Sequence, residues 1–237
     1  MRASVDLWYA RTASLFDEAA VQALLTDEER ARHRAYVFEK NRREYLATRG
    51  LERAALATVT GRPARSLRFH RTELGRPVLD DAVDVCFSLT NTVAFVGCAT
   101  SRCEVGLDAE AFERGPEIFR LASAVFTPVE RETLAGLVDV AERERRALEL
   151  WTAKEAYMKA RGLGLTLPPE DIEFDVHRQP ANLRIAPHHD TRPERWTLAT
   201  LAIAGHVVTV CVESKEPADI AVHEVSLNEL DRAGESR

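Results

Sequence analysis

The stretch Trp151-Thr-Ala-Lys-Glu155-Ala-Tyr-Met-Lys159-Ala-Arg-Gly162 decides how the C-terminal half of this chain folds. It closes a run of helix-forming residues that predicts one long helix over residues 141–161, ended by the glycines that follow. On this helix Trp151, Glu155 and Lys159 recur every four residues and form one stripe. An aromatic ring, a carboxylate and an ammonium group are therefore expected on the same face.

A second motif, Gly106-Leu-Asp108-Ala-Glu110, precedes this helix and alternates acidic with apolar residues. On a strand, Asp108 and Glu110 leave the same face. With Glu155 and Lys159 they would supply three carboxylates and a lysine, which can hold a hard divalent cation beside an anionic ligand, as where Mg²⁺ works on a phosphate substrate. Either motif alone is more typical of a solvated helix face or a strand end, so the prediction depends on both together.

The two motifs resemble the paired signatures of the 4′-phosphopantetheinyl transferases, G-[IV]-D-[IV]-E and W-[ST]-x-K-E-[AS]-x-x-K-x-x-G. The resemblance continues in order through a Gly75-Arg76-Pro77 turn and a Phe87-Ser-Leu-Thr-Asn-Thr92 strand, and covers roughly residues 37–165. The chain length is similar to that of the larger, single-chain, surfactin-synthetase-activating type.

The resemblance implies an activity and its cofactor. The family transfers the 4′-phosphopantetheine arm of coenzyme A to a serine of an apo acyl or peptidyl carrier protein and releases 3′,5′-ADP. It implies Mg²⁺, or Mn²⁺ in its place, held by Asp108, Glu110 and Glu155, with Lys159 donating to a phosphate oxygen. The proton of the serine would pass to Glu155 or to a water on the metal, and the sequence leaves both open.

Further residues are implied in coenzyme A binding. Arg53 matches a basic residue that contacts the 3′-phosphate, and Arg76 matches the basic residue of the Gly-[Lys/Arg]-Pro turn. Arginine suits both roles because it is permanently charged and can bind phosphate through two nitrogens. The Ser-His-Ser strand of the family reads Thr90-Asn91-Thr92 here. Thr90 keeps a hydroxyl, whereas Asn91 replaces a phosphate-contacting imidazole with a neutral amide.

The order strand, helix, strands occurs twice along the chain. A strand at residues 5–9 precedes a long helix and further strands, and a strand at residues 105–110 begins the same order again. Capping boxes at Thr26-Asp-Glu-Glu29 and Thr127-Pro-Val-Glu130 predict two shorter helices. The two halves share only this order of elements.

The resemblance implies the corresponding fold. It is an α+β fold with a pseudo-twofold duplication of two similar α/β halves, each a long helix packed on a small, mainly antiparallel sheet. We expect the halves to span residues 1–103 and 104–237, with the active site in the cleft between them. From Asp219 onward the sequence is polar, and we expect disorder at residues 234–237.

Composition excludes several classes of protein. With 237 residues, of which 45% are hydrophobic and 30% charged, the chain is typical of soluble globular proteins. No apolar run approaches the ~20 residues that span a bilayer, and the N-terminus lacks the apolar core of a signal peptide, so we expect a cytoplasmic protein without a membrane partner. The net charge of −6 argues against nucleic-acid binding. An internally duplicated chain can complete its own site, which favours a monomer.

One segment is nevertheless basic. Between Glu28 and Arg53 the chain concentrates its positive and imidazole side chains, namely Arg30, Arg32, His33, Arg34, Lys40, Arg42, Arg43, Arg49 and Arg53. This pattern fits either two solvated helices or a surface that docks an anionic ligand or an acidic partner.

Other functions fit the sequence less well. A catalytically lapsed module that binds coenzyme A or a carrier protein would be expected to lack a metal carboxylate, yet all three are present. An unrelated magnesium-dependent phosphoryl-transfer enzyme finds no support in a G-x-x-x-x-G-K-[ST] or G-x-G-x-x-G motif. A purely structural protein would not need several motifs in the order of the family. Neither signature distinguishes fatty-acid, polyketide and peptide carriers.

Overall fold

The computed structural model describes residues 2–12, 16–80, 84–175 and 182–227. The chain divides into two compact units. One consists of Val5–Arg102 with Ile220–Arg237, and the other of Met1–Ser4 with Cys103–Asp219. Residues 234–237, for which disorder is expected, lie outside the described residues.

The first unit is built on a long helix. It contains α1 (Glu18–Leu24), α2 (Asp27–Ala35), α3 (Glu39–Thr60) and the short 3₁₀ turn η1 (Ala64–Ser66). Thr26 and Glu29 form the predicted capping box at the start of α2. Helix α3 ends at Gly61, whose φ of 67° is one that glycine adopts without steric cost.

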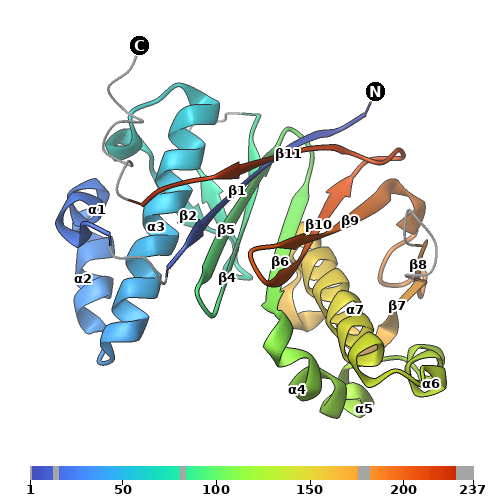
Figure 1. Ribbon diagram of the computed structural model, residues 1–237. Helices are drawn as coiled ribbons and strands as arrows, with labels where there is room; N and C mark the ends of the chain where they lie inside the picture. Colours follow the sequence, from blue (N-terminus) through green and yellow to red (C-terminus); the bar gives the residue numbers. More distant parts are fainter. Residues whose placement is uncertain (1, 13–15, 81–83, 176–181, 228–237) are drawn as a thin grey trace. The chain divides into compact units, whose positions relative to one another are not determined.

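A four-stranded sheet lies against α3 (Figure 1). Its strand order is β11-β1-β5-β4, from β1 (Ser4–Arg11), β4 (Cys86–Thr92), β5 (Phe95–Ser101) and β11 (Asp219–Glu224). Leu46, Leu51 and Ala55 of α3 share a buried core with Val96 and Cys98 of β5. A separate hairpin of β2 (Phe69–Arg71) and β3 (Pro77–Leu79) follows η1.

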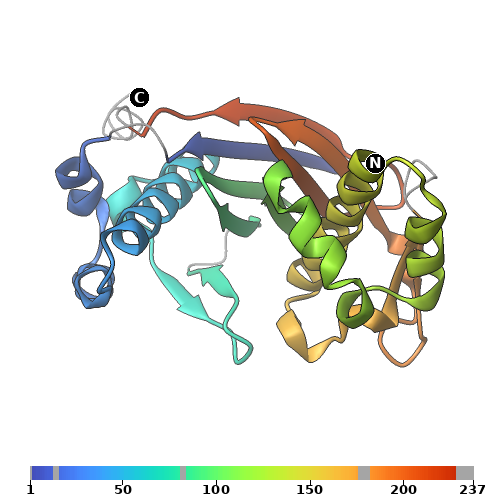
Figure 2. The ribbon, with the colours of Figure 1, turned by 60° about the horizontal axis from the view of Figure 1, so that its bottom comes forward.

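The second unit repeats this plan. Its helices are α4 (Gly115–Arg120), α5 (Ala122–Val125), α6 (Pro128–Gly136) and α7 (Val140–Arg161), and its 3₁₀ turns are η2 (Phe112–Arg114), η3 (Gly164–Thr166), η4 (Pro169–Asp171) and η5 (Pro193–Arg195). Helix α7 packs on a sheet of order β6-β10-β9 (Figure 2), formed by β6 (Val105–Ala111), β10 (His206–Glu213) and β9 (Trp196–Ile203). Strands β7 (Ile172–Asp175) and β8 (Asn182–Ile185) pair separately.

The predicted fold class is confirmed. Each unit places a helix of 22 residues on a small antiparallel sheet, which makes an α+β protein with two similar halves. Helix α7 ends at Gly162, as its sequence predicts, and Thr127 and Glu130 form the second predicted capping box. Among the described residues, no helix is both long and apolar enough to cross a membrane.

Candidate functional site

A glycine brings β6 directly against α7. A Cβ atom at Gly106 would overlap the carbonyl oxygen of Ala156 and the backbone nitrogen of Ala160. The strand backbone therefore touches the helix backbone, which a side chain would prevent. Asp108 and Glu110 follow at two-residue intervals, so they share the face of Gly106 that is turned toward α7.

Lys159 of α7 reaches this face of β6. Its Nζ donates to Asp108 Oδ1 over 2.7 Å and to the carbonyl oxygen of Leu107 over 3.0 Å. Asp108 is buried, whereas about a third of the Lys159 side chain is exposed. The structure thus joins one predicted strand carboxylate to the predicted helix lysine, with the ammonium still open to solvent.

Glu155 lies one helical turn before Lys159. Its pKa is raised to about 7, first by burial and then by the negative charges of Asp108 and Glu110, while Lys159 opposes the shift. Each of these three groups is thus close enough to act on Glu155. The sequence-predicted carboxylates and lysine are brought together within one unit.

Arg114 joins this group and was missed by the sequence analysis. Its Nη1 donates to Glu110 Oε1 over 2.6 Å. Its Nε and Nη2 bind the two carboxylate oxygens of Glu117, each over 3.2 Å, which orients the guanidinium. The only sequence signal was the spacing of four residues between Glu110 and Arg114, and that spacing is not specific.

The donor set suits a hard cation. Three carboxylates without cysteine or histidine are typical of Mg²⁺ or Mn²⁺ sites and not of zinc. Within the described ranges, however, no group of three acidic, histidine or cysteine side chains is already gathered closely enough to hold an ion. Asp108 and Glu110 instead bind Lys159 and Arg114. The carboxylates are suitable ligands for such a cation. To bind it together, Asp108 and Glu110 would have to leave their present contacts with Lys159 and Arg114.

Lys154, the other lysine of the helix motif, has a structural position. It is fully buried and donates to the carbonyl oxygens of Val125 and Pro169 over 2.9 and 2.8 Å. Its ammonium also pairs with buried Glu130 at 2.6 Å. Burial lowers the pKa of Lys154, and the charge of Glu130 opposes this. The lysine therefore ties α7 to the segments before α6 and β7.

In the first unit, Arg53 lies in the wall of a cavity of about 620 Å³. Its side chain is fully buried. Nη1 donates to the carbonyl oxygens of Ala64 and Leu67 over 2.7 and 3.3 Å, and Nη2 donates to Glu29 Oε2 over 2.7 Å. Both terminal nitrogens of Arg53 are thus already used within the unit.

The same cavity is rich in cations. The basic and aromatic residues of its lining are Arg32, Tyr45, Arg49, Arg53, Arg68, Phe69, His70 and Arg71. Pro77 and the acidic start of α2, namely Thr26, Asp27, Glu28 and Glu29, complete the lining. Arg76 precedes the lining residue Pro77 in the turn between β2 and β3. That turn contains Gly75 at a φ of 84°.

Thr90 and Asn91 occupy opposite faces of β4. Thr90 is buried, whereas Asn91 is exposed near the end of the strand. Asn91 pairs with Val96, and the neighbouring pair of Leu89 and Cys98 packs in the core that includes α3. Successive side chains alternate along a strand, so Thr90 and Asn91 cannot contact one ligand from the same face.

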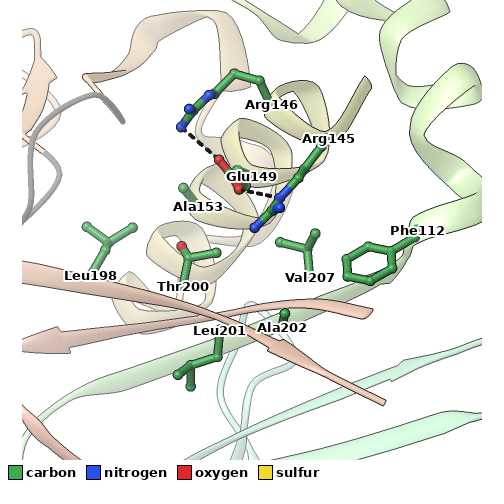
Figure 3. Close-up of a pocket in the computed structure, with 10 residues that line it drawn as sticks. All are labelled: Phe112, Arg145, Arg146, Glu149, Ala153, Leu198, Thr200, Leu201, Ala202 and Val207. Atoms are coloured by element: carbon green, nitrogen blue, oxygen red, sulfur yellow. Dashed lines mark hydrogen bonds and ion pairs between the residues drawn. The ribbon is translucent and has the colours of Figure 1, made fainter. Parts of the chain in front are cut away.

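A smaller pocket lies between the N-terminal half of α7 and strands β9 and β10 (Figure 3). Its cavity of about 220 Å³ contains none of the sequence-predicted residues. Arg145 and Arg146 both bind Glu149, over 3.2 and 2.8 Å, so much of the charge at this pocket is already neutralised.

Two family models and several known proteins match this chain. Residues 104–211 match the model of the 4′-phosphopantetheinyl transferase superfamily, and residues 8–101 match the model described as 4′-phosphopantetheinyl transferase, N-terminal. The 4′-phosphopantetheinyl transferase HetI of a Nostoc species is 30% identical over 77% of this chain and 80% of its own length.

Two further relatives come from other organisms. A phosphopantetheinyl transferase of a Thraustochytrium species is 32% identical over 89% of this chain and 79% of its own length. The 4′-phosphopantetheinyl transferase Sfp of Bacillus subtilis is 23% identical over 73% of this chain and 75% of its own length. The two family models between them cover both units, and the chain therefore belongs to the 4′-phosphopantetheinyl transferase family.

Proposed function

We propose that this protein transfers the 4′-phosphopantetheine group of coenzyme A to a serine of an apo acyl or peptidyl carrier protein, in a reaction that needs a divalent cation and releases 3′,5′-ADP. One observation carries the proposal. In a member of this family, Asp108 and Glu110 of β6 face Glu155 and Lys159 of α7 across a backbone contact that only glycine permits.

The residues have distinct roles in this proposal. Lys159 is partly exposed, so its ammonium group can leave Asp108 and donate a hydrogen bond to a phosphate oxygen of the substrate. Glu155 lies one helical turn from Lys159, and we propose that it accepts the proton of the attacking serine. Mg²⁺ held by Asp108, Glu110 and Glu155 would withdraw negative charge from the pyrophosphate.

The first unit would contribute to coenzyme A binding. The cavity around Arg53 has an excess of arginines and is large enough for a phosphate group, which supports the assignment of the 3′-phosphate to this region. We further propose that Arg76, Thr90 and Asn91 contact coenzyme A, Thr90 and Asn91 from opposite faces of β4, with Asn91 in the position of the family histidine. The monomeric state and the cytoplasmic location remain predictions.

The activity can be tested by intact mass spectrometry. Apo carrier protein incubated with this protein, coenzyme A and Mg²⁺ is expected to gain the mass of one phosphopantetheine, and to gain nothing when either coenzyme A or the cation is omitted. A lapsed binding module would bind coenzyme A without any mass change. If fatty-acid, polyketide and peptide carriers all stay unmodified, the proposed transfer is wrong.

A carrier docking surface is proposed on the turn between α2 and α3, defined by the exposed residues Arg34, Val37, Phe38 and Lys40. Val37 and Phe38 are 81% and 70% exposed, which is unusual for apolar side chains. Arg42 holds the turn by donating to the carbonyl oxygens of Tyr36 and Val37 over 3.0 and 3.2 Å. A rigid apolar pair flanked by cations fits an acidic partner that also presents apolar side chains.

Charge reversal on this surface should impair carrier recognition. The double variant Arg34→Glu with Lys40→Glu is expected to raise the carrier KM about tenfold and to flatten its salt dependence, because exposed charges mainly steer encounter. The coenzyme A KM should stay within about twofold, and Arg192→Glu, an exposed position in the other unit, serves as control. An equal rise in the coenzyme A KM would instead place these cations in the nucleotide site.

A further inference from the structure

Arg114 lies just beyond the strand that carries two carboxylates of the candidate site. It closes η2, the turn after β6, and its side chain is 34% exposed. The turn is held on two sides. The backbone nitrogen of Phe112 donates to the carbonyl oxygen of Gly205 over 3.0 Å, and a Cβ atom at Gly115 would lie 2.9 Å from Glu144 Cβ of α7. The backbone of Arg114 is therefore fixed relative to both β6 and α7.

The guanidinium of Arg114 is shared between two carboxylates. Its Nη1 donates to Glu110 Oε1 over 2.6 Å, while its Nε and Nη2 donate to Glu117 over 3.2 Å each. The side chain of Glu110 is 10% exposed, and that of Glu117 is 51% exposed. Arg114 thus joins an inner carboxylate, which belongs to the proposed cation site, to an outer carboxylate, which does not.

A cationic partner weakens a carboxylate as a metal ligand. Groups that strengthen a metal site from outside the coordination sphere usually make the ligand more basic, as a second carboxylate or a backbone carbonyl does. A guanidinium has the opposite effect, because it withdraws negative charge from Glu110 and repels a further cation. Lys159 acts on Asp108 in the same way. Both strand carboxylates are partly neutralised by side chains of the protein, so a free divalent cation gains little net attraction.

Glu117 gives Arg114 a second place to remain. It binds two of the three donor nitrogens through both of its oxygens, which is the paired contact that orients a guanidinium. Arg114 can therefore release Glu110 without leaving its own charge unpaired. The pyrophosphate of coenzyme A would add negative charge beside the carboxylates and would offer Lys159 another acceptor. The attraction for a divalent cation rises as a result, and the cation can replace Arg114 at Glu110.

We propose that Arg114 competes with the divalent cation for Glu110, so that the site binds the cation weakly until coenzyme A is bound. The inference deepens the proposed function and rests on it, since that function supplies coenzyme A as the second ligand. Glu117 is a positioning residue that holds Arg114 when Arg114 releases Glu110.

Binding of Mn²⁺ tests the proposal without a turnover assay. Electron paramagnetic resonance measures the free ion, with and without saturating coenzyme A, and a titration of coenzyme A alone corrects for the ion that it binds in solution. Arg114→Gln, which removes the charge, is expected to raise the affinity for Mn²⁺ about tenfold when coenzyme A is absent. With coenzyme A present, the variant and the wild type should agree within about twofold, so the coupling between the two ligands falls.

Matched variants separate the role of the charge from that of the position. Arg114→Lys keeps the charge, and its Mn²⁺ affinity should stay within about threefold of wild type. Arg120→Gln removes the same charge from the exposed end of α4 and should change the affinity by no more than about twofold. Glu117→Gln should lower Mn²⁺ affinity severalfold in the wild type and have no effect in the Arg114→Gln background, because it acts through Arg114.

The outcomes are distinct. If the wild-type protein binds neither Mn²⁺ nor coenzyme A, the proposed function falls and this inference falls with it. If the wild type binds both but Arg114→Gln binds free Mn²⁺ more weakly, Arg114 supports Glu110 as a ligand and the competition is wrong. Unchanged affinity overturns the inference as well. Circular dichroism checks the fold of each variant, and Arg114→Ala, which also removes the charge, replaces Arg114→Gln if that variant is unfolded.

Discussion

Replacing Asp108 by asparagine is expected to reduce phosphopantetheine transfer by about a hundred- to a thousandfold, the scale on which loss of one charge-stabilising group slows a reaction. The change removes one proposed cation ligand and also the carboxylate that Lys159 binds at 2.7 Å. Glu155→Gln should have a comparable effect, since it removes both a ligand and the proposed proton acceptor. The measurement is kcat with an apo carrier protein at saturating coenzyme A.

The control for these variants lies in the same segment. Glu113→Gln neutralises an exposed carboxylate that follows β6, and it should leave kcat within about twofold, as exposed single charges contribute little. All three proteins should unfold at similar temperatures, so that a loss of activity reports on the site. Near-normal turnover of Asp108→Asn or Glu155→Gln at limiting Mg²⁺ would show that the cation is held elsewhere.

The second large effect concerns stability. Gly106→Ala should destabilise the second unit by at least about 3 kcal/mol, the upper part of the range for overpacking a core. The added methyl group meets backbone atoms of Ala156 and Ala160 and not a movable side chain. Relief therefore requires α7 to move away from β6, which would also separate Lys159 from Asp108. Urea unfolding followed by circular dichroism measures the change.

Gly136 provides a matched control. It ends α6, and a Cβ atom there would meet nothing within 4 Å. Gly136→Ala should therefore change stability by no more than about 1 kcal/mol, in the stabilising direction that helix propensity favours. Equal unfolding midpoints for Gly106→Ala and Gly136→Ala would mean that the close approach of β6 and α7 is not required.

Much of this protein is determined locally and can be read from the sequence. The end of α7 at Gly162 follows from a glycine after a helix-forming run, and the hairpin of β9 and β10 turns at Ala204 and Gly205, which both have positive φ. Alternation along β6 predicts that Asp108 and Glu110 share a face, because the pleat of a strand leaves no other choice. These features depend on a few neighbouring residues. The family signatures lie in the same short stretches, so they can be identified from the sequence as well.

Other features depend on contacts between residues far apart in the chain. Strand β11 is mostly exposed, and it joins the sheet through pairing with β1, more than 200 residues earlier in the chain. Arg53 and Arg49 are both arginines of one helix, yet only the tertiary structure shows that Arg53 is fully enclosed while Arg49 is partly exposed. Lys154 likewise looks like a surface residue in sequence and is buried against Glu130. The segments that pack around a charged side chain determine whether it is buried and which partner it has. The local sequence pattern does not predict which distant segments these are.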